Sequence, residues 1–172
     1  MVEIVDLPTL PKGELADETT LIDLEQVESR QAFIHSFELV DVIGSQKVRF
    51  DGCEFAFAKL EPYLAKILLP PDGAIGSTEW VGMKRRNQRI PLTVLIYLMM
   101  LPQLCEAYRR LQSGKRHARL DPDELLDLRV EFPGEDQLEA LEAEIVRIRG
   151  RILQLREQQQ AVRAQVDDLF ET

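Results

Sequence analysis

The residues of this sequence best suited to bind a ligand are cations gathered in one stretch of the chain. Residues 84–119 contain nine lysines and arginines against one acid, Glu106, a local net charge of +8. These cations are Lys84, Arg85, Arg86, Arg89, Arg109, Arg110, Lys115, Arg116 and Arg119. The chain as a whole is acidic, with a formal net charge of −9. Because clustered charge can attract a polyanion even when the average is negative, the stretch indicates either a polyanion-binding surface or a solvated helix face with its loops.

Residues that could catalyse a reaction or bind a metal are few, and they are not spaced for either task. The histidines and cysteines are His35, His117, Cys53 and Cys105. His35 and both cysteines lie in apolar contexts typical of packed residues, whereas His117 lies among cations and could contact a phosphate. The acids Asp121, Asp123 and Glu124 are more typical of a turn and a helix cap than of a cation site. With no Gly-rich phosphate loop and no paired-histidine spacing, we expect no catalytic residue, no metal site and no cofactor.

Length and composition favour one packed domain with an extension. The chain has 172 residues, of which 45% are hydrophobic and 30% charged, so a core is expected and global disorder is not. Two cysteines exclude a disulfide-stapled scaffold and a four-cysteine zinc site. The N-terminal residues are acidic and interrupted by prolines, and the most apolar run, residues 92–101, is too short to span a bilayer. We expect a soluble cytoplasmic protein with no membrane partner.

Turn signals and side-chain periodicity predict an α+β domain of mixed short strands and helices. Residues 1–19 contain two prolines and scattered acids, which predicts an N-terminal arm without regular structure. Residues 20–133 form the predicted domain, with short strands at 37–43, 48–50, 53–58 and 79–83. Pro91 and Pro102 are each suited to the first turn of a helix, so helices are expected to about residues 100 and 114. A basic loop at 115–124 and a last strand or extended segment at 125–132 complete it.

The C-terminal residues 134–172 carry a heptad pattern. Apolar residues alternate steps of three and four, with one polar interruption at Gln159. They are Leu138, Leu141, Ile145, Ile148, Ile152, Leu155, Val162, Val166 and Leu169. This pattern predicts a coiled-coil helix of roughly 48 Å that needs a partner helix to bury its narrow apolar seam. The alternative is a long helix packed on its own domain.

Two segments of the chain resemble the target-recognition domain and spacer of type I restriction–modification specificity subunits. The first is residues 53–84, CEFAFAKLEPYLAKILLPPDGAIGSTEWVGMK. Its matching positions are Lys59, Pro62, Tyr63, Leu64, Lys66, Ser77, Thr78, Glu79 and Trp80. The second is residues 113–145, SGKRHARLDPDELLDLRVEFPGEDQLEALEAEI, which enters the heptad helix. Its matching positions are Gly114, Arg119, Leu120, Leu125, Val130, Pro133 and Gln137.

The resemblance covers about residues 20–172 and implies a half-length subunit. A complete subunit of that family carries two recognition domains and two spacer helices, whereas this chain has length for one of each. The family's usual opening before the first recognition strands is also shortened here. What the resemblance implies is a non-catalytic protein that holds double-stranded DNA and reads one half-site of a bipartite target. The implied protein partners are DNA adenine methyltransferase subunits, with restriction subunits as further partners.

The resemblance also implies roles for named residues. The basic stretch would face DNA, with two further cations as weaker candidates. The predicted DNA-binding residues are Lys84, Arg85, Arg86, Arg89, Lys115, Arg116, Arg119, Lys59 and Lys66. The heptad residues would form a homodimer. The charges beside the seam do not decide its direction, and Gln159 favours a parallel pair. The resemblance favours an antiparallel pair, which we predict because only that arrangement places the two recognition domains at opposite ends.

Three other functions stay open at this point. The chain could be a coiled-coil adaptor whose globular head binds an acidic protein partner, and specific duplex binding would exclude this. It could be a recognition fragment that belongs to a single-chain methyltransferase, but no catalytic methyltransferase sequence is present here, so the catalytic part would have to lie on a separate chain. A small enzyme that uses Cys or His is the third, and the missing constellations of catalytic residues argue against it.

Overall fold

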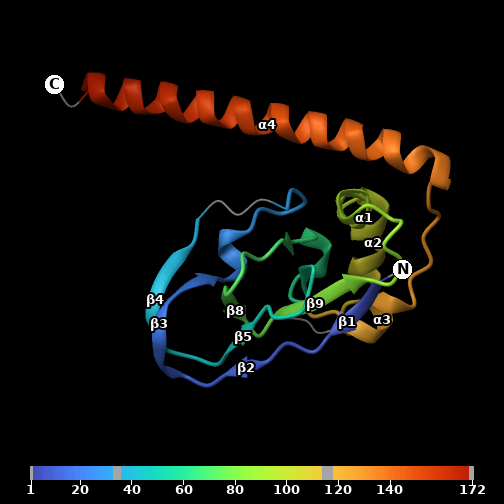
Figure 1. Ribbon diagram of the computed structural model, residues 1–172, viewed down its shortest axis with the longest axis horizontal. Coiled ribbons are helices and arrows are strands. Elements are labelled where there is room, and N and C mark those ends of the chain that lie inside the picture. The colour runs from blue at the N-terminus through green and yellow to red at the C-terminus, as the bar shows by residue number, and fades with distance from the viewer. Residues whose placement is uncertain (1, 33–35, 114–117, 171–172) are drawn as a thin grey trace. The chain divides into compact units, whose positions relative to one another are not determined.

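The computed structural model of the chain describes residues 2–32, 36–113 and 118–170. It divides into two compact units, residues 1–131 and residues 132–172. The strands of the first unit are β1 (Val2–Val5), β2 (Thr9–Leu10), β3 (Gly13–Ile22), β4 (Glu38–Ile43), β5 (Lys47–Arg49), β6 (Phe55–Ala58), β7 (Ile67–Leu68), β8 (Ile75–Ser77) and β9 (Trp80–Arg85). Its helices are the 3-10 turns η1 (Leu24–Gln26) and η2 (Pro62–Leu64) and the α-helices α1 (Leu92–Met99), α2 (Pro102–Leu111) and α3 (Pro122–Leu126). The second unit contains α4 (Glu135–Phe170) (Figure 1).

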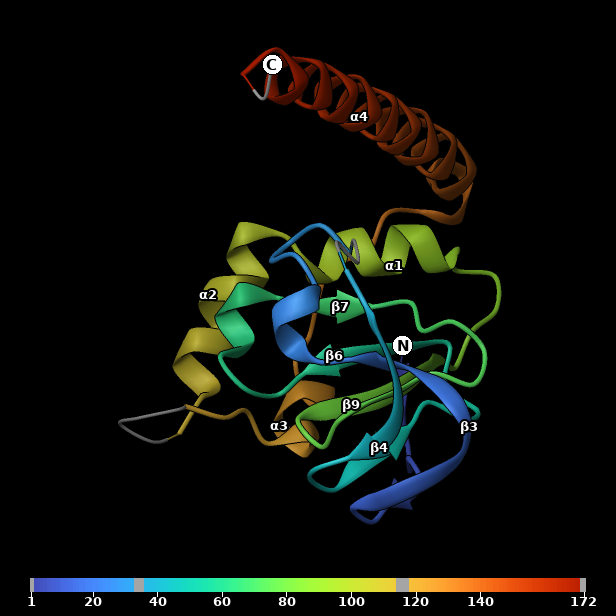
Figure 2. The ribbon, with the colours of Figure 1, turned by 90° about the vertical axis from the view of Figure 1, so that its left-hand side faces the viewer.

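The strands of the first unit form two sheets. A four-stranded sheet has the order β1-β9-β6-β7 and is antiparallel throughout. A five-stranded sheet has the order β2-β5-β8-β3-β4, in which only the β3–β8 pair is parallel. Figure 2 shows β6, β7 and β9 side by side, with α1 and α2 beside them. Together with the long helix α4, this architecture confirms the α+β prediction.

A core of apolar side chains joins the two sheets, and Trp80 lies within it. Trp80 belongs to β9 of the four-stranded sheet, and its indole N–H donates to the Ile22 carbonyl of the five-stranded sheet at 3.1 Å. Its ring meets Phe50 edge-on, with 6.4 Å between the centroids. Because a buried indole N–H needs an acceptor, this bond fixes how the sheets face each other.

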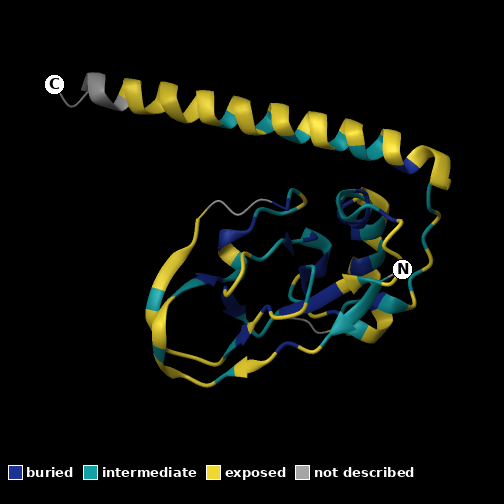
Figure 3. Cartoon of the chain, in the orientation of Figure 1, coloured by how far each residue is buried: buried dark blue, intermediate teal, exposed yellow. Residues whose placement is uncertain are grey.

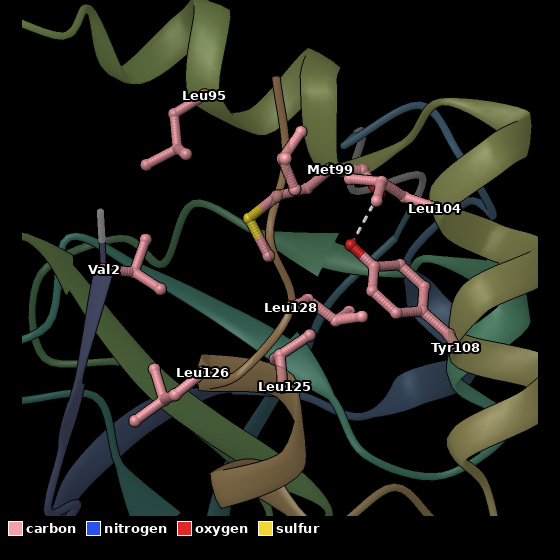
Figure 4. Close-up of a pocket in the computed structure, with 9 residues that line it drawn as sticks. Val2, Leu95, Met99, Leu104, Tyr108, Leu125, Leu126 and Leu128 are labelled. Carbon is pink, nitrogen blue, oxygen red and sulfur yellow. Dashed lines mark hydrogen bonds between the residues drawn. The ribbon is translucent and has the colours of Figure 1, made fainter. Parts of the chain in front are cut away.

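Helices α1 and α2 are joined to the four-stranded sheet through Tyr108. The Tyr108 ring packs edge-on against Phe57 of β6, 5.3 Å between centroids, and its hydroxyl donates to the Met99 carbonyl at 3.1 Å (Figure 4). Burial raises the pKa of Tyr108, so the hydroxyl keeps its proton and remains a donor. An apolar cavity of about 70 Å³ adjoins the ring. It is lined by Val2, Leu95, Met99, Leu104, Tyr108, Leu125, Leu126, Leu128 and Val130.

The predicted central elements are confirmed close to their expected bounds. The strands predicted at 37–43, 48–50, 53–58 and 79–83 correspond to β4, β5, β6 and β9, and the helices opened by Pro91 and Pro102 to α1 and α2. The expectation that residues 1–19 lack regular structure is wrong, because β1 pairs with β9 and β3 pairs with both β4 and β8. Those strands are stabilised by hydrogen bonds to residues far along the chain, which a local pattern does not show.

The strand or extended segment expected at residues 125–132 begins in fact as a short helix. Asp121 accepts a hydrogen bond from the Asp123 N–H at 3.0 Å, and Pro122 occupies the first turn of α3. This is the helix cap that the acids near residue 121 indicated. The helix ends at Leu126, and residues 128–134 form no strand.

The long C-terminal helix is confirmed. Its 36 residues include every predicted heptad position, and at 1.5 Å per residue it is about 54 Å long. Four apolar residues of the seam are among the exposed large hydrophobic side chains: Ile148, Leu155, Val162 and Val166. No helix in the described ranges is both long and apolar enough to cross a membrane.

Replacing Gly76 should destabilise the contact between the sheets. A Cβ at Gly76 would lie 2.6 Å from the Ile22 carbonyl oxygen and 2.9 Å from the Trp80 ring, so Gly76→Ala must displace backbone. We expect a loss of about 1–3 kcal/mol in the free energy of unfolding, measured by urea denaturation. Gly44→Ala is the control, because a Cβ there meets nothing within 4 Å. Equal stability of the two variants would contradict this account of the core.

Candidate nucleic-acid interface

The cations predicted to bind DNA fall into two clusters, one at each end of β9. The β9-end cluster consists of Lys84, Arg85, Arg86 and Arg89, at the last residues of β9 and the loop that follows. The β9-start cluster consists of Lys59 and Arg119, which contact Glu79 just before β9, and of Arg109, which lies on the Tyr63 ring of the turn η2. Six strand residues separate the clusters by about 20 Å. The stretch 84–119 is therefore continuous in sequence but not one surface patch. Lys115, Arg116 and His117 lie outside the described residues.

Arg85 holds the loop after β9 in place. Its guanidinium donates to both carboxylate oxygens of Glu54 at 2.8–3.3 Å, and its backbone N–H donates to Glu54 Oε2 at 2.7 Å. The same guanidinium donates to the Ile90 carbonyl at 2.8 Å, across the loop. The Arg85 side chain is only 16% exposed. Arg85 thus has a structural role that its sequence context did not reveal, although it was predicted as a DNA contact.

The carboxylate of Glu54 is stabilised by the same pair. Hydrogen bonds from the Arg85 side chain lower the pKa of Glu54 to about 2, against an opposing effect of burial. Glu54 therefore stays ionised through the physiological pH range. A charged carboxylate with bidentate donors is among the stronger polar interactions in proteins, so it gives the loop a defined geometry.

The loop after β9, which the Arg85–Glu54 pair holds in place, presents polar side chains to solvent. Arg86, Asn87, Gln88 and Arg89 are all exposed. The Arg89 N–H donates to Asn87 Oδ1 at 3.0 Å, which closes a turn within the loop. The amides of Asn87 and Gln88 carry the donors and acceptors that can read base edges, yet the sequence reasoning did not name them. The sequence does contain a feature that could have indicated them: Asn87 is the only asparagine of the chain, and arginines flank the Asn87–Gln88 pair on both sides.

Glu3 limits the charge of the β9-end cluster. The β1–β9 pairing sets Glu3 opposite Lys84, and the two form an ion pair of 3.0 Å. Arg86 Nε lies 3.9 Å from the other Glu3 oxygen. Arg86 is nevertheless 61% exposed, so its guanidinium is accessible to a phosphate. Surface pairs of this kind are weak and exchange readily with other anions.

In the β9-start cluster, Arg119 forms a bidentate pair with Glu79. Its Nε donates to both carboxylate oxygens at 3.0 Å, and a terminal nitrogen donates to Oε1 at 2.7 Å. This carboxylate raises the pKa of Arg119 further. Arg119 also exchanges two backbone hydrogen bonds with Ser113, at 2.9 and 3.0 Å. These two bonds hold the backbones of Ser113 and Arg119 side by side.

The remaining cations of the β9-start cluster lie on neighbouring elements. The Lys59 N–H donates to the Glu79 carbonyl at 3.0 Å, which fixes its backbone next to β9. Arg109 lies 4.4 Å from the ring centroid of Tyr63, a cation–π contact, and it also pairs with Glu106. Arg110 is 77% exposed. Arg109 and Arg110 belong to the basic stretch but are not among the predicted DNA contacts. The contact with Tyr63 adds Arg109 to this cluster, whereas Arg110 pairs with Glu106 on its own helix.

Lys66 belongs to neither cluster. Its ammonium donates to the Leu24 carbonyl at 2.7 Å, at the start of the η1 turn. The contact joins two segments that are 42 residues apart. Lys66 is partly buried, and its bond to the Leu24 carbonyl gives it a structural role.

Metal-binding groups and reactive thiols were the catalytic features to look for in the described residues. Within these ranges no group of three or more His, Cys, Asp or Glu residues is arranged to hold a metal ion. Burial raises the pKa of the Cys53 and Cys105 thiols, which keeps them protonated and poorly nucleophilic at neutral pH. Cys105 is buried and Cys53 is partly buried, as expected for packing residues.

Solved structures share this fold. An HsdS subunit from Thermoanaerobacter tengcongensis is 17% identical, with a TM-score of 0.55 over 89% of this chain and 42% of that chain. A chain from a structural study of complex assembly and conformational transition of the type I R-M system is 20% identical, with a TM-score of 0.59 over 94% of this chain and 45% of that chain. The chain thus spans less than half the length of each. The predicted resemblance to type I specificity subunits is confirmed at the level of the fold. No family model and no curated protein matches the sequence.

The Arg85–Glu54 pair should make a measurable, pH-dependent contribution to stability. Glu54→Gln removes a partly buried charge from its donors, and we expect the free energy of unfolding at pH 7 to fall by about 1–3 kcal/mol. Because the folded pKa of about 2 lies below the ordinary value of 4.5, the contribution is full above pH 4.5 and is lost as the pH falls towards 2.

The measurement is urea denaturation of wild type and Glu54→Gln between pH 7 and pH 2. Glu131→Gln, which removes an exposed carboxylate, is the matched control. The difference between wild type and Glu54→Gln should shrink on acidification. A difference that stays constant down to pH 2 would show that the charge of Glu54 does not stabilise the loop.

Proposed function

We propose that this chain is a non-catalytic DNA-recognition subunit of a type I restriction–modification complex, and that it reads one half-site of a bipartite target. The observation that carries the proposal is the shared fold with an HsdS subunit over 89% of this chain. Exposed cations at both ends of β9 support it, since phosphate contacts supply most of the affinity of such proteins. Its partners in this proposal are double-stranded DNA and DNA adenine methyltransferase subunits, with restriction subunits joining the assembled complex.

The two clusters would have different tasks at the DNA. Arg86 and Arg89 are exposed on a loop held by the Arg85–Glu54 pair, so they are suited to fix that loop on the phosphates. Asn87 and Gln88 lie between them, and an amide can bond an adenine edge through both of its groups. Gln88 would have to release the weak bond from its Nε2 to the Arg85 carbonyl to do so. In the β9-start cluster, Lys59 and Arg119 would contact a second part of the DNA backbone. Lys115 and Arg116, outside the described residues, stay proposed as DNA contacts from the resemblance alone. Arg85 and Lys66 would act indirectly, by holding their segments in place.

The long helix supports the pairing of two half-length chains. The apolar seam of α4 includes Ile148, Leu155 and Val162, which are 44%, 48% and 57% exposed. Exposed seam residues at heptad spacing favour a partner helix. We infer an antiparallel homodimer, because that arrangement carries two recognition units at opposite ends of the rod. A target read by two copies would then be palindromic.

Reversing the charge of the exposed loop should weaken DNA binding without changing the fold. For Arg86→Glu/Arg89→Glu we expect at least about tenfold weaker binding to random-sequence duplexes, and a salt dependence shallower by about two phosphate contacts. Arg85 stays intact, because its loss would disturb the loop itself. The measurement is fluorescence anisotropy across a salt series.

Lys12→Glu/Arg129→Glu is the matched control, since both cations are exposed and lie outside the two clusters. It changes the net charge equally and should have a much smaller effect. If both double variants weaken binding to the same extent, the β9-end cluster is not a DNA contact. If the wild-type chain binds no duplex, alone or with its methyltransferase subunit, the proposed function is wrong.

The antiparallel pairing predicts which cysteines cross-link. After Cys53 and Cys105 are replaced by alanine, chains with Val166→Cys and chains with Leu141→Cys should form a disulfide with each other when mixed. Val166→Cys alone should not, because the seam pairs Val166 of one helix with Leu141 of the other. Ala164→Cys, on the opposite face of the helix, serves as the control with Leu141→Cys. A strong Val166–Val166 cross-link would show parallel pairing, and a monomer by light scattering at tens of micromolar would exclude the dimer.

A further inference from the structure

Strand β4 is an unpaired edge of the five-stranded sheet. It pairs with β3 on one side, and the strand order places no described strand on its other side. Figures 1 and 3 show β4 at the margin of the first unit beside β3, with both strands largely exposed. An edge strand offers a row of backbone donors and acceptors to any extended segment that approaches it. The six residues of β4 provide an edge of about 20 Å.

Apolar side chains accompany this edge. Leu39 and Val42 of β4 are 56% and 55% exposed, and Phe37, just before the strand, is 60% exposed. One exposed apolar residue is ordinary on a protein surface, but three within six positions of an edge strand are typical of a contact surface. Val40 and Ile43 pack inward on Leu21 and Ile75, so the exposed residues are not needed by the core.

The surroundings of the edge are acidic. Five exposed acids lie on the β3–β4 ribbon, whose residues 13–22 and 36–43 contain no lysine or arginine. They are Glu14, Asp17, Glu18, Glu38 and Asp41. A hollow of about 530 Å³ adjoins the start of β4, and its walls include Asp23, Glu25, Glu38 and Glu79. Glu79 is already paired with Arg119, so Glu25 and Glu38 supply most of the negative charge. Lys47 bonds one oxygen of Asp23 at 2.7 Å, and the other oxygen is buried and accepts no hydrogen bond within the described residues.

These charges decide which partner the edge can accept. A second copy would bring Glu38 and Asp41 against the same acids, and like charges across an edge are repulsive. A nucleic acid backbone is repelled for the same reason. An extended segment that carries both apolar residues and lysine or arginine would instead cover Leu39 and Val42 and meet the acids with opposite charge.

We propose that β4 is the docking edge for an extended basic segment of the methyltransferase subunit, which adds to the sheet as a further strand. A lysine or arginine of that segment would enter the acidic hollow next to Glu38. The inference rests on the proposed function for the identity of the partner. It assigns protein binding to the acidic ribbon and DNA binding to the two cation clusters, on separate strands of the same unit.

The test measures the affinity of the full chain for the purified methyltransferase subunit of the same system, by biolayer interferometry. Glu38→Lys/Asp41→Lys should weaken this binding at least about tenfold. Asp72→Lys/Glu131→Lys is the matched control, because it makes the same charge change at exposed acids elsewhere on the unit and should leave the affinity within about twofold. Binding of each variant to random-sequence DNA is recorded alongside, as the check that the fold persists.

A second variant covers the case in which charge reversal disturbs the ribbon. Leu39→Ser/Val42→Ser keeps every charge and removes the exposed apolar groups, and it should also weaken binding to the methyltransferase subunit. Wild-type affinity in both β4 variants overturns the inference while the proposed function stands. A wild-type chain that binds DNA but not the methyltransferase subunit overturns both the docking part of the proposed function and this inference.

Discussion

Trp80 is the residue on which the arrangement of the first unit depends. Its indole N–H reaches the Ile22 carbonyl, its ring meets Phe50, and Gly76 leaves room for it where a larger residue would collide. Trp80 also begins β9, so the same contact that joins the sheets sets the position of that strand. Both cation clusters are attached to the ends of β9. The length of β9 sets how far apart the clusters lie, and the buried hydrogen bond helps to fix where that strand lies in the core.

Ion pairs decide which cations are accessible at the surface. Arg85 and Arg86 are adjacent in sequence, but Arg85 is engaged by Glu54 and the Ile90 carbonyl, whereas Arg86 is largely exposed with a distant acid. Arg85 keeps the loop in shape through its bonds to Glu54 and the Ile90 carbonyl. Arg86 can exchange its weak contact with Glu3 for a phosphate at little cost in free energy. Neighbouring arginines thus contribute to an interface in two ways, through geometry and through charge. The number of lysines and arginines in a stretch of sequence does not distinguish these two roles.

The acidic average of the chain is consistent with a DNA-binding surface because the charges are segregated by element. Exposed acids lie on β3 and β4, and exposed cations lie at the ends of β9 and in the last turn of α2. At physiological ionic strength charges interact over only about 8 Å, so the acids of one surface have little effect on the cations of the other. Because acids and cations lie on different elements, one small unit has a surface suited to a polyanion and another suited to a basic protein segment.

The sequence by itself determined the features that depend on neighbouring residues. The heptad spacing of Leu138 to Leu169 predicts α4 because a helix repeats every 3.6 residues, and Pro91 and Pro102 mark the starts of α1 and α2 because proline suits a first helical turn. The turn at Asp51-Gly52 likewise separates β5 from β6. The order of short motifs between Lys59 and Gln137 was enough to indicate the fold that the solved structures share.

Only the tertiary structure decided the features that join distant parts of the chain. Residues 2–5 form a strand because they pair with residues 82–85. Residues 13–22 form a strand between β4 and β8, although their acidic residues mask an alternation of apolar and polar side chains. The split of the basic stretch, the structural role of Arg85 and the acidic edge at β4 have the same origin. Each depends on contacts between residues tens of positions apart, and such contacts form when the whole core closes, so no local window of sequence contains them.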